Sequence, residues 1–178
     1  MIQKITYREL TENELYLLSK IDRSEKIFES YQYRNNALIL VNSPISAGPF
    51  DPPELEEMIK HQRELIYAEG KVIAAFENKQ IIGAASVDRR RRGRNKDYCK
   101  MDILYVSKNS RGKKVGQMLL QKCKRIAKAF GASRLYISAT PTKGTVDFYI
   151  SNNAILVKEP DEELFKMEPN DIHLEIVL

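Results

Sequence analysis

Apolar and polar residues follow each other along this chain in patterns that predict both strands and helices. Between Lys100 and Phe130, an apolar strand that includes Ile103 and Tyr105 comes directly before a long helix. On this helix, apolar residues recur at spacings of three and four, as one buried stripe requires. The stripe consists of Val115, Leu119, Cys123, Ile126, Ala127 and Phe130. We expect this strand and helix to form the centre of the fold.

The first part of the chain predicts a strand over residues 2–8 and a helix that begins at Thr11. Thr11 and Glu14 have the spacing of a capping box, in which each residue satisfies a backbone N–H group at the start of a helix. Residues 24–53 are less regular: residues 37–41 have a β-like pattern, and the four prolines between residues 42 and 53 exclude a helix there. We interpret them as an arm that either forms a wall for a substrate or simply packs on the domain. A second helix is expected over about 53–68.

The second part of the chain predicts a mixed sheet. We expect strands at residues 72–77, 81–87, 97–106 and 134–138, a short helix at 143–152, and closing strands at 163–168 and 172–178. The first three strands are joined by short connections and should be antiparallel, whereas a helical crossover makes the fourth parallel to the third. The chain is therefore expected to form an α+β fold.

Length and composition indicate one soluble domain over residues 1–178, with 43% apolar and 30% charged residues. The N-terminus has no apolar signal region, and no apolar run approaches the ~18 residues of a membrane helix. We therefore expect a cytoplasmic protein without a membrane partner. Cys99 and Cys123 fit reduced core thiols, and the two histidines lie far from them in sequence, so no metal site is predicted.

The net charge of +5 has a local source, because five arginines between residues 89 and 94 equal it. This run lies between two predicted strands, so we expect it at the tip of a hairpin. Two interpretations remain open: a solvated loop, or a docking patch for an acidic partner or for the phosphates of a ligand. Aromatic residues are not interleaved with the arginines, which argues against nucleic acid as a partner.

The junction between the central strand and helix carries a second basic cluster. Arg111, Lys113 and Lys114 come just before the helix, whose N-terminus already has unpaired N–H groups and a partial positive charge. Gly112 and Gly116 allow the main chain to approach an anion closely. We infer a phosphate site at this junction. The alternative is a set of solvated surface lysines before an ordinary helix.

Two common phosphate-binding motifs are absent, the P-loop and the Gly-x-Gly-x-x-Gly fingerprint of dinucleotide-binding proteins. Residues 111–116 instead resemble the Arg/Gln-x-x-Gly-x-Gly/Ala signature of the GNAT superfamily of acyl-CoA-dependent N-acyltransferases. Lys114 stands where that signature has its first glycine. The Ile-Leu-Tyr-Val at 103–106 and the Val-Asp-Phe-Tyr at 146–149 strengthen the resemblance, which covers about residues 70–156.

The resemblance implies a strongly twisted mixed sheet of about six or seven strands flanked by helices. It also implies an N-acetyltransferase that moves an acetyl group from acetyl-CoA to a primary amine of a small molecule or peptide, by direct attack in a ternary complex. The implied cofactor-binding residues are Leu104, Tyr105 and Val106 at the thioester, and Arg111, Gly112, Lys113, Lys114, Val115, Gly116 and Gln117 at the pyrophosphate. Tyr149 is the implied catalytic residue, an acid that protonates the leaving thiolate. Its alternative is a half-buried helix aromatic.

Several points stay open at this stage. The general base is not assigned, and each candidate could be an ordinary polar residue; the candidates are His61, Asp97, Asp102, His173 and Glu175. A second hypothesis for function is a non-catalytic acyl-CoA-binding module that docks nucleic acid or the ribosome through Arg89–Arg94. A third is a nucleotide-phosphate binder unrelated to coenzyme A. Exposed strand edges also allow a homodimer.

Overall fold

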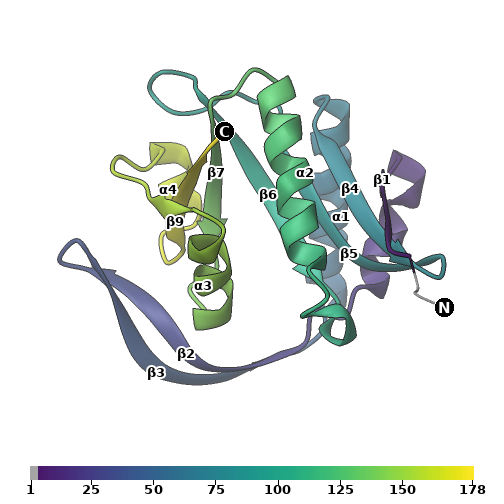
Figure 1. Ribbon diagram of the computed structural model, residues 1–178, viewed down its shortest axis with the longest axis horizontal. Coiled ribbons are helices and arrows are strands. Elements are labelled where there is room, and N and C mark those ends of the chain that lie inside the picture. Colours follow the sequence, from purple (N-terminus) through teal and green to yellow (C-terminus); the bar gives the residue numbers. More distant parts are fainter. Residues whose placement is uncertain (1–3) are drawn as a thin grey trace.

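A seven-stranded mixed sheet forms the body of the protein in a computed structural model that describes residues 4–178 (Figure 1). The strand order is β1-β4-β5-β6-β7-β9-β8. The strands are β1 (Thr6–Glu9), β4 (Lys71–Glu77), β5 (Gln80–Val87), β6 (Tyr98–Val106), β7 (Arg134–Ala139), β8 (Ile155–Leu156) and β9 (Ile172–Val177). Only β6 and β7 are parallel neighbours among them. The predicted mixed sheet and its strand number are confirmed; residues 2 and 3 of the predicted first strand lie outside the described residues.

Helices cover both faces of this sheet. They are η1 (Glu12–Lys20), α1 (Pro52–Tyr67), η2 (Lys108–Ser110), α2 (Val115–Ala129), α3 (Lys143–Ser151) and α4 (Glu162–Met167). In Figure 1, α2 lies in front of the sheet and α1 behind it. One core cluster joins Leu119 of α2 and Val146 of α3 to the front face. A second joins Leu18 of η1 and Leu65 of α1 to the back face. Within the described residues, no helix is both long and apolar enough to cross a membrane.

The predicted helix boundaries follow from capping chemistry. Glu14 accepts hydrogen bonds from the backbone N–H of Thr11 (3.0 Å) and from its hydroxyl (3.1 Å), which completes the expected capping box. Helix α1 begins after Asp51, whose carboxylate accepts from the N–H of Glu54 (2.8 Å). At the end of α2, Gly131 adopts the left-handed conformation (φ 86°), as the sequence predicted.

Residues 24–53 are more regular than expected. Strands β2 (Glu25–Arg34) and β3 (Ala37–Ala47) form a separate two-stranded antiparallel ribbon that runs along one end of the body (Figure 1). The ribbon has a bulge opposite Ile27–Glu29 that accommodates Pro44 of β3, a residue without an N–H group to donate. Tyr31 anchors the ribbon to the body: its N–H donates to the carbonyl of Pro141 (2.7 Å) and its hydroxyl to Asp147 (2.8 Å).

The strand expected at 163–168 is wrong, because these residues belong largely to helix α4. The carboxylate of Asp161 accepts from the N–H groups of Glu163 (3.1 Å) and Leu164 (3.2 Å), and acidic residues fill the first turn. These are helix-starting features that outweigh the short apolar pattern. Strand β8 takes the place at the edge of the sheet instead.

Strand β6 has a β-bulge, in which it contains one residue more than the segment of β5 paired with it. Ala85 lies opposite Leu104 and Val87 lies opposite Met101, so three steps on β6 match two on β5. This bulge places Met101 and Leu104 on the same face, although they are an odd number of residues apart. A bulge bends its strand and increases the local twist. Pairing of β6 with β7 ends at Met101–Ile137, in the same place.

Candidate functional site

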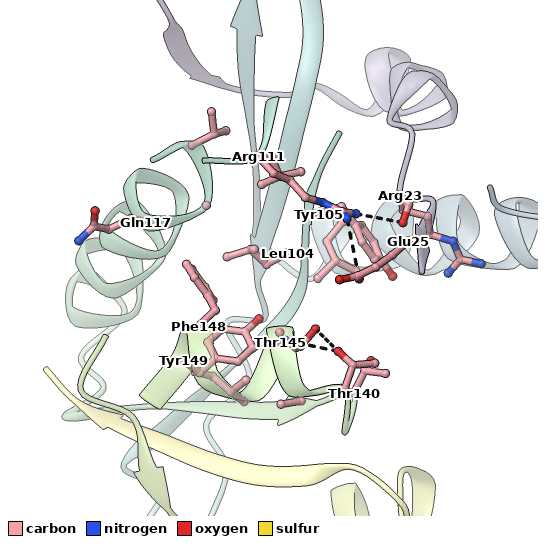
Figure 2. A pocket seen from close by; sticks show the side chains of 18 of the residues that line it. Arg23, Glu25, Leu104, Tyr105, Arg111, Gln117, Thr140, Thr145, Phe148 and Tyr149 are labelled. Carbon is pink, nitrogen blue, oxygen red and sulfur yellow. Dashed lines mark hydrogen bonds and ion pairs between the residues drawn. The ribbon is translucent and has the colours of Figure 1, made fainter. Parts of the chain in front are cut away.

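A cavity of about 780 Å³ opens where β6 and β7 part. Its walls come from the ends of both strands, the loop before α2, helix α3 and the start of the ribbon (Figure 2). The volume is within the usual range for a small-molecule site. Parallel strands that separate in this way leave main-chain groups on both sides of the gap without a strand partner. A ligand between them can use these groups.

The main chain of β6 directs two amide groups into the gap. The N–H of Ser107, just after β6, donates to the carbonyl of Ile82 in β5 (2.8 Å). Alternate residues of an antiparallel strand direct their N–H groups to the same neighbouring strand, so the N–H of Tyr105 also points toward β5. The amides of Leu104 and Val106 therefore face the gap. Preorganised N–H donors of this kind stabilise negative charge that develops on a carbonyl oxygen.

The loop before α2 has the backbone geometry of an anion site. Gly112 (φ 77°) and Lys114 (φ 62°) are both left-handed, and Lys114 is the N-cap residue of α2. Lys114 thus adopts the conformation that a glycine takes readily, at a cost of about 1–2 kcal/mol for a residue with a side chain. The first hydrogen bond of the helix runs from Met118 N–H to the Lys114 carbonyl (3.0 Å). The N–H groups of residues 115–117 therefore precede the helix's own bonding.

The three cations of this loop are not equally free to meet an anion. Arg111 donates to the carbonyl of Arg23 (3.1 Å) and lies beside the start of the ribbon (Figure 2). Lys113 pairs with Glu77 (2.9 Å) and does not line the cavity. Within residues 4–178, Lys114 pairs with no carboxylate. The sequence therefore overstated the number of available charges, and the backbone supplies more of the site than the side chains do.

Tyr149 lies at the α3 wall of the cavity. Its side chain is buried (6% exposed), and its ring packs edge to face against Phe148 with centroids 5.1 Å apart. Figure 2 shows its hydroxyl directed toward Leu104 of β6. Burial raises the pKa of Tyr149 well above its ordinary value, so the hydroxyl is protonated at neutral pH. The side chain can donate a proton or a hydrogen bond into the cavity.

The cavity brings together nearly all of the residues that the sequence suggested for cofactor binding and catalysis. Those that line it are Leu104, Tyr105, Val106, Arg111, Gly112, Lys114, Val115, Gly116, Gln117 and Tyr149. Lys113 alone is turned to a different partner, Glu77. Glu25 and Ile27 of β2 also line the cavity, so the arm at 24–53 does form part of its wall, whereas Arg23 and Ser138 were not among the residues that the sequence suggested.

Asp102 lines the cavity, and its side chain contacts α1 at the back face of the sheet. Its carboxylate is 3.2 Å from Nε2 of His61, accepts from Nε2 of Gln62 (2.7 Å), and lies 3.5 Å from Nζ of Lys100. Burial alone favours the neutral acid, but the hydrogen bonds and the Lys100 charge outweigh it and lower the pKa of Asp102 to about 2. Asp102 is therefore ionised. His61 and Asp102 are the two general-base candidates that meet.

The remaining candidates for a general base bond to other groups. Glu175 accepts from Arg134 (2.6 Å), and Asp97 lies 3.6 Å from the same guanidinium. His173 is buried between the Tyr136 hydroxyl (2.7 Å) and a backbone carbonyl (3.0 Å). Of the five candidates, Asp102 lines the cavity and His61 does not, and none of these three lines it. They are structural polar residues of β9 and of the sheet end.

The arginine loop is attached to the rest of the protein by ion pairs, although the side chains of Arg89, Arg90 and Arg94 stay largely exposed to solvent. Its partners are Glu69 for Arg89 (2.9 Å), Glu163 for Arg90 (2.8 Å) and Arg92 (3.3 Å), the Phe130 carbonyl for Arg91 (3.1 Å), and Glu159 for Arg94 (3.7 Å). Three of these contacts reach α4 or the turn before it. The loop does not line the cavity, so it offers nothing to the phosphates of a ligand there.

Comparison with known proteins agrees with the geometry. Residues 36–151 match the family model described as Acetyltransferase (GNAT) family. No curated protein matches the chain. Solved structures that resemble this one have sequence identities of 13–20%, and at such identities the likeness shows the shared fold.

Three solved structures illustrate the likeness. A nourseothricin acetyltransferase has 14% identity and a TM-score of 0.69, over 97% of this chain and 98% of that one. A putative streptothricin acetyltransferase from Bacillus anthracis, in complex with acetyl coenzyme A, has 17% identity and a TM-score of 0.68, over 100% and 99%. The PaiA N-acetyltransferase from Thermoplasma acidophilum, in complex with coenzyme A, has 17% identity and a TM-score of 0.64, over 98% and 99%.

Proposed function

The chain belongs to the GNAT acetyltransferase family, and from this membership we propose that it is an N-acetyltransferase. Acetyl-CoA is the donor, the acceptor is a primary amine of a small molecule or peptide, and transfer is direct within a ternary complex. The observation that carries the proposal is the gap between β6 and β7, with the loop at 111–116 lining it together with Tyr149.

The residues around the gap fit the parts of acetyl-CoA. The loop amides at 112–117 and the Lys114 ammonium suit the pyrophosphate, because an anion is favoured at the N-terminus of a helix as long as α2. A side chain at Gly112 would meet nothing within 4 Å, so that side of the loop has room for a ligand. The parted strands suit the pantetheine arm, whose amides can bond to the main chain that β7 leaves unpaired. When bound, acetyl-CoA supplies an activated acetyl thioester.

The chemistry assigned to the chain is modest and local. The amides of Leu104 and Val106 polarise the acetyl carbonyl, and the Tyr149 hydroxyl donates a proton to the sulfur as it leaves. A covalent cysteine intermediate has no support. Cys123 is fully buried, and burial raises its thiol pKa to about 12; Cys99 is buried as well, and neither lines the cavity. These properties favour direct attack by the amine.

The alternative of a non-catalytic module that docks nucleic acid has less support. It requires guanidinium groups at Arg89–Arg94 that are available to phosphates, and each of the five has an intramolecular partner. The third hypothesis, a nucleotide binder unrelated to coenzyme A, offers no role for Tyr149.

The test is release of free thiol from acetyl-CoA across a panel of amines, with mass spectrometry of the acetylated product. Tyr149→Phe should lower kcat by about 100-fold, as loss of a general acid does, and leave the affinity for coenzyme A in calorimetry nearly unchanged. Tyr16→Phe, at an exposed tyrosine of η1 outside the cavity, is the matched control and should behave as wild type. Failure of every amine to release thiol from the wild-type protein would refute the proposal.

A further inference from the structure

His61 and Asp102 form a pair that the proposed reaction has not yet used. They are 41 residues apart in sequence, on α1 and β6, and the distance from Nε2 of His61 to Oδ1 of Asp102 is 3.2 Å. The Asp102 side chain is 10% exposed and lines the cavity, whereas the His61 side chain is 53% exposed. The pair thus connects the gap between β6 and β7 with the solvent at the back face of the sheet.

Hydrogen bonding fixes which nitrogen of His61 can act as a base. Because Asp102 is ionised, it only accepts hydrogen bonds, so Nε2 of the neutral imidazole carries the proton that it shares with Asp102. The lone pair is then on Nδ1. A carboxylate that holds an imidazole in one tautomer and stabilises its cation is the arrangement used by many histidine bases.

The surrounding groups keep Asp102 ionised, so His61 is the member of the pair that gains and loses a proton near neutral pH. The carboxylate of Asp102 contacts Gln62 and Lys100 as well as His61. Lys100 also pairs with Glu168, which precedes β9 (3.1 Å). The charged groups that act on His61 are Asp102 and Lys100 from β6 and Glu64 from α1. The hydrogen bond to Asp102 raises the pKa of His61, although burial and Lys100 oppose that effect. Asp102 itself is a poor base, because its pKa is about 2.

The location of the pair relates it to the site of acetyl transfer. Asp102 comes two residues before Leu104, whose amide faces the gap, and α1 covers the face of the sheet opposite to α2. The loop that suits the pyrophosphate belongs to the α2 side. Asp102 lines the cavity and His61 does not, so the α1 side of Asp102 is where an amine in the gap comes nearest to His61.

We propose that His61 is the general base of the reaction, that Asp102 is its positioning residue, and that the acceptor amine enters from the α1 side. This inference rests on the proposed N-acetyltransferase function. In the step, a nitrogen–carbon bond forms and the carbon–sulfur bond breaks. The proton of the attacking nitrogen goes to Nδ1 of His61, and the sulfur takes a proton from the Tyr149 hydroxyl. Solvent then returns the proton from the imidazolium to the tyrosinate, so the protein ends as it began.

The kinetic test compares His61→Gln with Lys60→Gln, an exposed neighbour on the same helix. His61→Gln should lower kcat/KM at neutral pH by about 100-fold or more, the usual effect of losing a general base. In the wild type, kcat/KM should rise as pH passes upward through the His61 pKa, because only the neutral ring accepts a proton. In His61→Gln this rise of kcat/KM with pH should be absent. Lys60→Gln should keep both the wild-type kcat/KM and its rise with pH.

Asp102→Asn tests the positioning role with a readout other than activity. Removal of the negative charge should lower the His61 pKa, so the rise of kcat/KM with pH and the NMR titration of the ring should both move to lower pH. The chain has two histidines, so the spectrum of His61→Gln assigns the His61 signals, and the titration needs no coenzyme. Circular dichroism confirms that each variant is folded.

Two results would overturn the inference: activity of His61→Gln within threefold of wild type with the same rise of kcat/KM with pH, or an unchanged His61 titration in Asp102→Asn. Absence of thiol release by the wild type is a different result. It would refute the proposed function, and with it the role of His61 as a base, while the NMR titration would still report on the pair.

Discussion

The loop at 89–94 carries five arginines and the loop at 111–114 carries three cations, yet only the second lines the cavity. Carboxylates of the protein pair with four of the five arginines, and two of these carboxylates, Glu159 and Glu163, lie in or near α4. In the second loop, Lys114 keeps its charge without a carboxylate partner in the described chain, and it caps a helix of 15 residues.

The difference between the two loops shows what identifies an anion site. The density of positive charge in the sequence was highest at 89–94, where the fold uses the charges to attach one loop to another. At 111–116 the useful donors are largely backbone N–H groups, which composition does not report. Left-handed residues and the start of a long helix were therefore the better indicators. Three predictions test this contrast, beginning with the largest effect.

Arg92→Ala should lower the free energy of unfolding by about 2 kcal/mol. Arg92 has the most buried guanidinium of its loop, with a side chain 10% exposed, and it lies 3.6 Å from Asp88 and 3.3 Å from Glu163. Removal of the guanidinium leaves the negative charges of Asp88 and Glu163 without this positive partner. Urea unfolding measures the change. Arg94→Ala, where the side chain is 84% exposed, is the control and should have no measurable effect. Equal effects of the two variants would show that the loop is not attached as described.

Lys114→Glu should weaken binding of coenzyme A about tenfold, because it places a carboxylate at the N-terminus of α2, where the pyrophosphate is expected. The loss should be smaller at high salt, where exposed charges are screened. Isothermal titration calorimetry at two salt concentrations measures it. Arg94→Glu changes the net charge equally and should leave the dissociation constant unchanged. If both variants weaken binding alike, only the overall charge matters and the contrast between the loops is lost.

Lys114→Gly should have the smallest effect, an increase of at most about 1 kcal/mol in the free energy of unfolding. Glycine removes the strain of a left-handed residue with a side chain, but it also gains more freedom in the unfolded chain. Thermal unfolding measures the net result. Lys114→Ala removes the same charge and keeps the strain, so it separates the two contributions. A glycine variant less stable than the alanine variant would show that the left-handed conformation costs nothing here.

The sequence predicted well the parts of the molecule that are set by local patterns. The stripe on α2, the stop at Gly131 and the parallel strand that follows all depend on residues a few positions apart. The lining of the cavity by residues 104–106, 111–112, 114–117 and Tyr149 followed from motifs within this continuous part of the chain.

The parts that the sequence could not predict depend on residues distant in the chain. The partners of the arginine loop lie up to 73 positions away, and nothing in a local window links Arg90 to Glu163. The same holds for His61 and Asp102, which the sequence offered only as separate candidates. The ribbon was predicted only in part, at residues 37–41 of β3, because Pro44 and the bulge break the strand periodicity beyond them. In α4, a capped helix start outweighed a short apolar run that resembled a strand.

The extra residue in β6 has a consequence for how the cavity is encoded. Without it, Met101 and Leu104 would be two positions apart, still on one face, and β6 could run straight and continue its ladder with β7. The gap between β6 and β7 therefore depends on the length of one strand as well as on the side chains that line it. Substitutions can narrow this gap. We expect that deletion of Ile103 would close the gap and leave a folded protein that cannot bind a ligand there.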